Sequence, residues 1–256
     1  MIGTRKANLF LRFSVLVACA IAFQCGVAVL RPLCDCEAAC TSASEPLLAT
    51  EEGDSVSFWN GSADTIQLPP VPRAGEVSIE EAIWCRRSIR SFTDEAPTPD
   101  IVSRLLWAAQ GVTSEEGFRS APSAGATYPL EVFLAAPAYL ARYEPEGHRL
   151  IITMRKDVRK ALAKAALGQH WFDNAPLIFI LAADVSRTSV RYGKRADLYV
   201  HIEVGCASEN LMLQAAAMGW GSVPIGAFLE EDVSRVLELP KEWTPYLIVP
   251  VGVEAE

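Results

Sequence analysis

The order of apolar and polar residues predicts a mixture of helices and strands from Ser78 to the C-terminus. Apolar residues at helical spacing predict helices over residues 78–85, 98–110, 158–167, 199–218 and 231–237. Apolar runs of strand length predict strands over residues 130–136, 177–183 and 246–253, a hairpin over 139–154, and a strand or loop over 222–228. Because helices and strands do not alternate strictly, the pattern is typical of an α+β fold.

Several of these elements carry further signals. Ser78 and Glu81 have the spacing of a capping box, and Thr98 precedes a proline where the next helix would begin. The uninterrupted apolar run over 177–183 indicates a central strand. The helix over 199–218 is apolar almost all round. We therefore expect this long helix to be buried in a core or in a subunit interface.

The first forty residues differ in character from the rest. Residues 1–12 carry positive charge, and residues 13–30 contain no charged side chain. That length is borderline between a signal-peptide core and a short membrane span, so an uncleaved anchor and a cleaved leader both remain open. Positive charge before the apolar run and acidic residues after it predict a cytoplasmic N-terminus. The remainder would then be membrane-anchored or exported, on the periplasmic or other extracytoplasmic side.

Composition divides the chain into three predicted parts. They are a membrane anchor or export signal with a cysteine-rich end at 1–40, a linker that becomes an extended arm at 41–76, and a folded domain at 77–256. The cysteine-rich end contains Cys34, Cys36 and Cys40, which could bind metal, pair in disulfides or do neither. Their spacing matches no established metal-site pattern, so we predict no metal site.

The chain is acidic, with a net charge of −8 over 256 residues, and half of its residues are hydrophobic. This balance allows a sizeable core and argues against general nucleic-acid binding. Against it stands a basic cluster, Arg86, Arg87, Ser88 and Arg90. Guanidinium forks and a hydroxyl match the oxygens of a phosphate, which favours binding of a phosphate-bearing small molecule. The alternative is a solvated basic helix end, since cations are favourable there.

Two other stretches are rich in small residues. In the loop over 121–129, small side chains would let the backbone approach a flat ligand, and Ser123 and Thr127 could donate hydrogen bonds. The glycines of residues 219–226 could admit a ligand in the same way. An ordinary turn and a helix cap followed by a strand would explain the two stretches equally well. No Walker motif and no G-x-G-x-x-G occurs, so a P-loop or Rossmann site is unsupported.

Taken in order, four motifs resemble those of the nitroreductase-like FMN flavoproteins. They are Arg-Arg-Ser-x-Arg at 86–90, Pro-Ser-Ala-Gly-x-x-Tyr-Pro at 122–129, the helix segment 202–215, and Pro-Ile-Gly-Ala-Phe at 224–228. Within that family the chain looks most like the branch that includes the SagB-type azoline dehydrogenases. The resemblance covers residues 77–253, and four ordered motifs are far more specific than any one of them.

The resemblance implies a nitroreductase-like α+β fold with a central mixed or antiparallel sheet, flanking helices and a long central helix. It also implies an intertwined homodimer with two FMN sites at the interface. The FMN phosphate and ribityl chain would be held by Arg86, Arg87, Ser88 and Arg90. The isoalloxazine ring would be lined from the other subunit by Pro122, Ser123, Ala124 and Gly125. The ring near N5, where hydride enters and leaves, would be contacted by Ile225, Gly226 and Ala227.

Two features depart from the family pattern. Typical nitroreductases place basic residues near the C-terminus that also touch the phosphate, whereas residues 250–256 here are acidic and short. Neutralisation of the phosphate would then rest on the cluster at 86–90 alone. Azoline dehydrogenases of this branch use an adjacent Lys-Tyr pair as acid-base groups, and this chain has none. Its nearest substitutes are Lys194 and Tyr192, which could also be part of a solvated loop.

By resemblance, the leading functional expectation is an FMN-dependent oxidoreductase of the nitroreductase type with NAD(P)H as donor, acting on a small-molecule or peptide substrate. The same-fold alternative is a SagB-type dehydrogenase that oxidises a peptide or small molecule with oxygen as acceptor. A non-catalytic flavin-binding protein is the alternative from another class. Reduced nicotinamide is scarce outside the cytoplasm, so an extracytoplasmic location would disfavour the first expectation.

Overall fold

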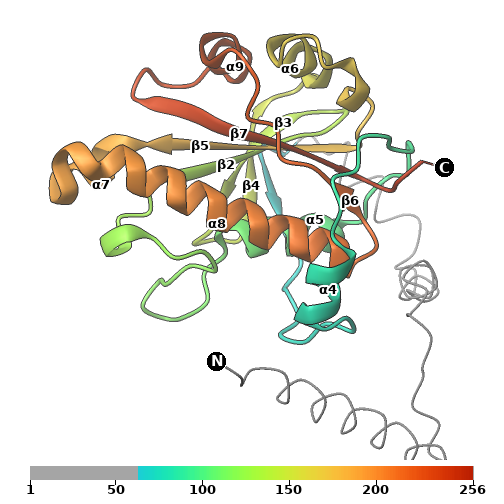
Figure 1. Ribbon diagram of the computed structural model, residues 1–256, viewed down its shortest axis with the longest axis horizontal. Coiled ribbons are helices and arrows are strands. Elements are labelled where there is room, and N and C mark those ends of the chain that lie inside the picture. The colour runs from blue at the N-terminus through green and yellow to red at the C-terminus, as the bar shows by residue number, and fades with distance from the viewer. Residues whose placement is uncertain (1–62, 256) are drawn as a thin grey trace, which may run out of the picture. The chain divides into compact units, whose positions relative to one another are not determined.

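The computed structural model describes residues 63–255 (Figure 1). The apolar segment 13–30 and Cys34, Cys36 and Cys40 lie outside the described residues, so anchoring, export and thiol pairing stay predictions. Between residues 63 and 255, no helix is both long and apolar enough to cross a membrane. The predicted boundary between linker and domain at residues 76 and 77 also stays a prediction.

In the described part of the chain, seven strands form one antiparallel sheet in the order β1-β4-β3-β2-β5-β7-β6 (Figure 1). The strands are β1 Thr65–Gln67, β2 Leu130–Ala135, β3 Leu140–Glu144, β4 Arg149–Met154, β5 Leu177–Asp184, β6 Gly221–Ser222 and β7 Trp243–Gly252. In the register, Ile180 of β5 lies opposite Phe133 on one side and Ile248 on the other. All of β5 except its last residue is buried. The prediction of a central strand is confirmed, because a strand covered on both faces has a continuous apolar sequence.

Helices cover both faces of this sheet. They are α4 Ile79–Cys85, α5 Pro99–Gln110, α6 Arg159–Ala165, α7 Val185–Tyr192, α8 Ala196–Ala217 and α9 Glu230–Leu237, with short 3₁₀ helices η1 Ala124–Ala126, η2 His170–Phe172 and η3 Gly193–Arg195. Figure 1 shows α4, α5 and α8 on one side of the sheet and α6 and α9 on the other. One hydrophobic cluster contains Leu105 and Leu211 of the first side, and a second contains Leu162 and Val233 of the other. The predicted α+β fold is confirmed.

The long helix α8 begins at Ala196, three residues before the predicted start, and ends at Ala217. One of its sides packs into the core through Val200, Val204 and Leu211. The other side is mixed: Leu198 and Ile202 are more than half exposed there, beside exposed polar side chains such as Asp197 and His201. Exposed large apolar side chains of this kind can pack against a second protein surface.

Local start signals act as predicted. The Ser78 hydroxyl accepts a hydrogen bond from the Glu81 amide at 3.1 Å, and Thr98 caps α5 in the same way at 3.4 Å. The predicted hairpin forms as β3 and β4. The apolar spacing gave no signal for α7, because its sequence is mostly polar and Thr188 is the only residue of that helix that is fully buried. Strand β1 is only three residues long and lies inside the predicted arm.

A group of buried and partly buried polar side chains, which we call the His148 cluster, fastens the chain after β1 to the domain. His148 Nε2 lies 2.7 Å from Ser103 Oγ and 3.0 Å from the Pro69 carbonyl oxygen, and His148 Nδ1 lies 2.8 Å from Tyr143 Oη. The Ser103 hydroxyl also donates to the Pro69 carbonyl at 2.6 Å. The arm is therefore held by this cluster as well as by the pairing of β1 with β4.

Candidate functional site

The arginine segment, residues 86–90, runs from the end of α4 along the β6 edge of the sheet. Ser88 pairs with Ser222 of β6, and the Ile89 amide donates to the Ser222 carbonyl at 3.1 Å. A Cβ on Gly221 would lie 2.8 Å from Ile89 Cβ. The glycine therefore lets the arginine segment lie directly against β6, which fixes its backbone.

The three guanidinium groups of this segment differ in what they contact. Arg86 Nε lies 3.5 Å from Glu209 Oε1 on α8. Arg87 donates to two backbone carbonyls at 2.8 and 2.9 Å. Arg90 donates to one backbone carbonyl at 3.5 Å and lies 6.0 Å from the centre of the Trp171 ring. Among residues 63–255 no carboxylate lies within 4.0 Å of Arg87 or Arg90, so both keep positive charge for an outside anion.

The segment Ile225–Ala227 shares this edge of the sheet, because it follows β6 by two residues. Ile225 is fixed by two backbone hydrogen bonds with Ile248 of β7, of 2.8 and 3.0 Å. Gly226 and Ala227 are exposed, and a Cβ on Gly226 would meet no atom within 4 Å. The backbone is thus held on one side and open on the other, as close approach of a flat ligand requires.

The third candidate segment belongs to a loop with an unusual backbone, residues 122–128, which we call the Pro122 loop. Gly125, Ala126 and Tyr128 have positive φ values of 62°, 53° and 44°. Such values cost about 1–3 kcal/mol in residues other than glycine and persist only where other contacts impose them. One such contact is the Tyr128 amide, which donates to Ser123 Oγ at 2.9 Å. Hydrogen bonds within the loop therefore help to hold this conformation.

Beneath the Pro122 loop, α8 carries an acidic side chain in the core. Glu203 is 2 % exposed, and it lies close enough to Ser123 for that hydroxyl to influence its pKa. Its Oε1 atom has no hydrogen-bond partner in the part of the chain that the structure describes. Burial raises the pKa of Glu203 to about 7, against the lowering effects of the Ser123 hydroxyl and the Arg119 charge. A buried carboxyl with a near-neutral pKa is a candidate acid-base group.

The sequence-based prediction missed Glu203 as a site residue, although the helical spacing contained a signal. Glu203 lies three residues after Val200 and four before Ala207, within the stripe that packs into the core. Ionisable side chains seldom occupy such a stripe unless they are paired or functional. Its approach to Ser123 could not be foreseen, because the two residues are eighty positions apart.

The two weak catalytic candidates lie in different environments. Tyr192, the last residue of α7, lies against the Pro122 loop, since a Cβ on Gly125 would be 2.9 Å from Tyr192 Oη. Its ring stacks edge-on against Tyr199, with the ring centres 4.8 Å apart. Lys194 lies in η3 and is exposed. Tyr192 is therefore placed beside a candidate ring-lining segment, whereas Lys194 has no such contact among the described residues.

Within one chain the candidate residues form two groups on different sides of α8. The arginine segment reaches Glu209, and the Pro122 loop reaches Glu203. Six helical residues separate these two positions by about 9 Å along the axis and about 120° around it. Within one chain, the arginine segment and the Pro122 loop therefore do not face each other. Neither of them alone forms the complete predicted flavin site.

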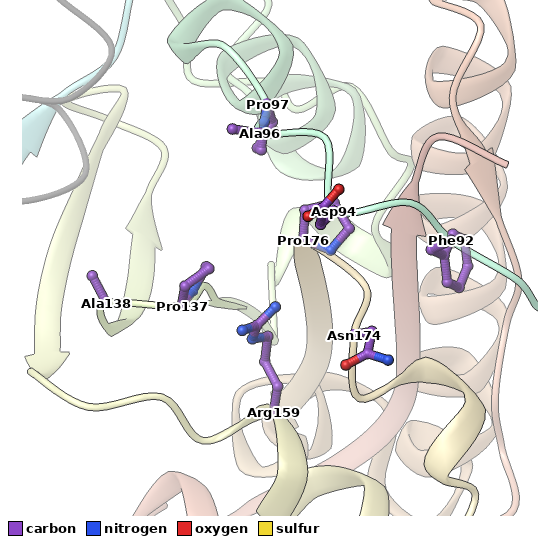
Figure 2. Close-up of a pocket in the computed structure, with 9 residues that line it drawn as sticks. All are labelled: Phe92, Asp94, Ala96, Pro97, Pro137, Ala138, Arg159, Asn174 and Pro176. Carbon is purple, nitrogen blue, oxygen red and sulfur yellow. The ribbon is translucent and has the colours of Figure 1, made fainter. Parts of the chain in front are cut away.

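A cavity of about 550 Å³ lies elsewhere, between the start of β5 and the segment before α5 (Figure 2). Its walls include Phe92, Pro97, Pro176 and the side chain of Arg159. The Arg159 guanidinium is already engaged, since Nη2 donates to Asp157 Oδ2 at 2.7 Å and Nη1 to a backbone carbonyl at 2.9 Å. With its cation neutralised in this way, the cavity is poorly suited to a phosphate group.

Large exposed apolar side chains gather on α4 and α8, which pack against each other. Five of them are more than half exposed, namely Ile79, Ile83, Trp84, Leu198 and Ile202. The predicted apolar stripe of α4 is thus buried only in part within one chain. Exposed apolar side chains on α4, which leads into the arginine segment, and on the first half of α8 are typical of an interface with another protein surface.

Comparisons with known proteins agree with this fold. A sequence model described as the Nitroreductase family matches residues 83–253. A Methanocaldococcus jannaschii protein whose name places it among the nitroreductases is 38 % identical over 202 residues, 77 % of this chain and 100 % of the relative. The FMN reductase [NAD(P)H] of Bacillus subtilis is 26 % identical over 70 % of this chain and 66 % of its own length.

A solved structure from Ralstonia eutropha JMP134, also named as a nitroreductase, superimposes with a TM-score of 0.69. It is 26 % identical, and the match covers 77 % of this chain and 92 % of that one. The family match spans the arginine segment, the Pro122 loop, α8 and the segment Ile225–Ala227, which carry the predicted site residues. The chain therefore belongs to the nitroreductase family of oxidoreductases.

Proposed function

We propose that the protein is an FMN-dependent oxidoreductase that works as a homodimer, with a reduced nicotinamide as its hydride donor. The observation that carries this proposal is the pair Arg87 and Arg90. Both are held by backbone contacts beside β6, and neither faces a carboxylate within 4.0 Å among residues 63–255. Two unpaired guanidinium groups in an acidic chain fit a phosphate monoester.

The remaining residues at this edge also fit FMN. Exposed backbone at Gly226 and Ala227 leaves room for a planar ring beside the arginine segment. Arg87 and Arg90 would hold the phosphate, with Ser88 as a further donor. When bound, FMN supplies hydride exchange at its N5 atom, first with the donor and then with a second substrate. The protein contributes position and electrostatics.

A second copy of the chain would complete the site. The Pro122 loop lies on another side of α8 from the arginine segment, so it cannot line a ring bound beside Gly226 of the same chain without reaching around the helix. The exposed apolar side chains of α4 and α8 supply a surface on which such a copy could pack. This arrangement supports the homodimer expected from the resemblance.

Binding of FMN by variants of the purified full-length protein tests the proposal. Charge-assisted hydrogen bonds to a phosphate are worth about 1.5–3 kcal/mol each, so Arg87→Ala and Arg90→Ala should each raise the FMN Kd by about tenfold or more. Arg235→Ala is the matched control, because Arg235 lies on α9 across the sheet and is paired with Asp232. Quenching of FMN fluorescence measures Kd. A folded protein that takes up no FMN would contradict the proposal.

The position of Tyr192 favours a second candidate function, a SagB-type dehydrogenase that passes electrons from a peptide or small molecule to oxygen. Its hydroxyl lies beside Gly125 in the predicted ring-lining loop, where it could hold or move a substrate proton. Turnover separates the candidates. Oxidation of NADH or NADPH favours the reductase, hydrogen peroxide formation without nicotinamide favours the dehydrogenase, and FMN binding without either reaction favours a flavin-binding protein.

A further inference from the structure

The His148 cluster joins the arm to the domain through hydrogen bonds whose donors and acceptors can all be assigned. We propose that this cluster is a pH-operated latch, in which His148 holds the arm when its ring is neutral and loosens it when the ring takes up a proton. The latch would act on residues 64–72, which lie against β4 and α5. It needs no flavin, so it stands or falls independently of the proposed function.

His148 contacts the arm through both its backbone and its side chain. Its carbonyl oxygen accepts hydrogen bonds from the Leu68 amide at 3.2 Å and from the Gln67 side-chain amide at 3.1 Å. Its ring atom Nε2 lies 3.0 Å from the Pro69 carbonyl oxygen. The side chain of Leu68, between these contacts, is 4 % exposed. Three consecutive residues of the arm therefore depend on the position of His148.

The contacts of the cluster fit one placement of the hydrogen on the neutral ring. The Ser103 hydroxyl donates to the Pro69 carbonyl at 2.6 Å, so its oxygen can only accept from His148 Nε2, 2.7 Å away. Nε2 therefore carries the ring hydrogen, and Nδ1 accepts from the Tyr143 hydroxyl at 2.8 Å. With the hydrogen on Nδ1 instead, Nε2 and the Pro69 carbonyl oxygen would be two acceptors only 3.0 Å apart.

Uptake of a proton at His148 Nδ1 disrupts this arrangement. Both nitrogens of a charged imidazole are donors, so the Tyr143 hydroxyl would have to turn its hydrogen away from the ring. Tyr143 is 1 % exposed and makes no other hydrogen bond within residues 63–255, so that hydrogen would be buried without an acceptor. Burial also raises the pKa of Tyr143 far above its ordinary value, so the hydroxyl keeps its hydrogen. A charged ring therefore destabilises the latched arm.

The charged side chains around the cluster give a protonated ring little net help, because they occur in pairs of opposite sign. The pairs on the neighbouring segments are Glu144 with Arg149, Glu146 with Arg119, Asp100 with Arg104, and Asp64 with Arg155. Burial lowers the pKa of His148, against the raising effect of its hydrogen bond to the Pro69 carbonyl. The ring is therefore neutral at pH 7 when the arm is latched.

Acid should open the latch. In the released arm His148 is in water with its ordinary pKa of 6.5, whereas its pKa is lower in the latched state. The released state therefore binds the proton more tightly, so the latch is complete above about pH 6.5 and weakens as pH falls. With one buried hydrogen bond lost, opening should be about fivefold more frequent at pH 5 than at pH 7.5. Release would leave β4 as the edge strand of the described sheet.

Hydrogen exchange of the arm in the full-length protein tests the latch. Mass spectrometry of the amides between residues 65 and 71, corrected for the intrinsic exchange rate at each pH, reports how often the arm opens. The wild type should open about fivefold more often at pH 5 than at pH 7.5. His148→Gln offers a donor and an acceptor but no titratable ring, so this ratio should be close to one. Tyr143→Phe has no hydroxyl hydrogen to lose its acceptor, so it should also lose most of the ratio.

Two controls separate a pH switch from simple loosening of the arm. Ser103→Ala removes the hydrogen bonds of Ser103 but leaves His148 Nδ1 beside the Tyr143 hydroxyl. It should raise opening at both pH values and keep the fivefold ratio. His170→Gln changes an exposed histidine outside the cluster and should behave as the wild type. Loss of the ratio in Ser103→Ala as fully as in Tyr143→Phe would contradict Nδ1 as the switching atom.

Nitrogen NMR of the His148 ring in the wild type gives a second test that needs no variant at the latch. We expect the hydrogen on Nε2 at pH 7.5 and a titration midpoint below 6.5. His148 has a positive φ of 45°, so glutamine there costs stability at every pH, and only ratios between pH values are compared. A hydrogen on Nδ1, a ring charged at pH 7.5, or equal exchange ratios in the wild type and His148→Gln would overturn the latch.

Discussion

A single buried carboxyl, Glu203, combines three properties: almost no exposure, one oxygen without a hydrogen-bond partner among residues 63–255, and a position next to the Pro122 loop. Burial disfavours the ionised carboxylate in the folded chain, whereas in the unfolded chain the carboxyl is in water and ionises at its ordinary pKa. The folded-state pKa of about 7 is raised above the ordinary value of 4.5. Glu203 therefore makes the free energy of unfolding depend on pH.

Protonated Glu203 stabilises the folded protein at low pH. Because the folded state binds the proton more tightly, the stabilisation is complete below about pH 4.5 and is lost as pH rises through about 7. From pH 5 to pH 8, the free energy of unfolding should fall by about 2–3 kcal/mol more in the wild type than in Glu203→Gln. Urea unfolding at the two pH values measures this difference.

The matched control for this prediction is Glu209→Gln, which changes an exposed glutamate on the same helix. It should keep the pH dependence of the wild type. Equal slopes for the wild type and Glu203→Gln would mean that Glu203 is ionised at low pH in the folded protein, contrary to the effect of its burial.

At the scale of helices and strands, local sequence signals predicted several elements, but they gave no information about which distant segments pair. The caps at Ser78 and Thr98 and the apolar run of β5 are local, so α4, α5 and β5 could be placed from sequence alone. The polar helix α7 could not, because Thr188 alone anchors it deep in the core. The bridge between Ser88 and Ser222 joins positions 134 residues apart, and no local pattern predicts it.

Contact between the arginine segment and β6 depends on one glycine, Gly221. In Gly221→Ala the new Cβ would press on Ile89, so we expect a loss of about 1–3 kcal/mol in the free energy of unfolding, together with weaker FMN binding. Adding Ile89→Ala should recover part of the loss, with a favourable coupling of about 0.5 kcal/mol or more. Urea unfolding and FMN titration of the two single variants and the double variant measure this coupling.

Gly226→Ala controls for the substitution itself, since its Cβ would meet open space. Its free energy of unfolding should stay within about 0.5 kcal/mol of the wild type. If Gly221→Ala is equally harmless, then the segment can move away from β6 without cost, and the fixed position assigned to the arginines is wrong.

At the scale of the whole molecule, the described residues leave several large apolar side chains of α4 and α8 exposed to solvent. Sequence reasoning recognised that α8 is apolar all round but could not decide between a core and an interface. The structure divides the two sides, with Val200 and Leu211 in the core and Leu198 and Ile202 exposed. Among residues 63–255 no carboxylate lies within 4.0 Å of Arg87 or Arg90, and this was equally invisible in sequence, because pairing depends on which carboxylates the fold brings near.

A second copy packed on these apolar side chains should be disrupted by a buried charge. We expect Ile202→Asp to convert the protein to a monomer and to lose bound FMN at the same time, because each site would need both chains. Light scattering coupled to size-exclusion chromatography, with absorbance of the bound flavin, records both properties in one experiment.

The control is Leu167→Asp, which places the same charge at an equally exposed leucine after α6, across the sheet from α8. It should leave both mass and flavin content unchanged. An Ile202→Asp protein that stays dimeric and coloured would show that the copies meet through another surface.

Strand β1 and the His148 cluster also have a mechanical consequence. Any tension on the chain from the N-terminal side enters the domain at β1 and reaches the cluster at Pro69 before it can reach α4 and the arginine segment. In the described sheet, β1 and β6 are the two opposite edge strands, with five strands between them. A pulling force would therefore be carried by the β1–β4 pair and the His148 cluster. The edge that carries Arg87 and Arg90 would stay free of load.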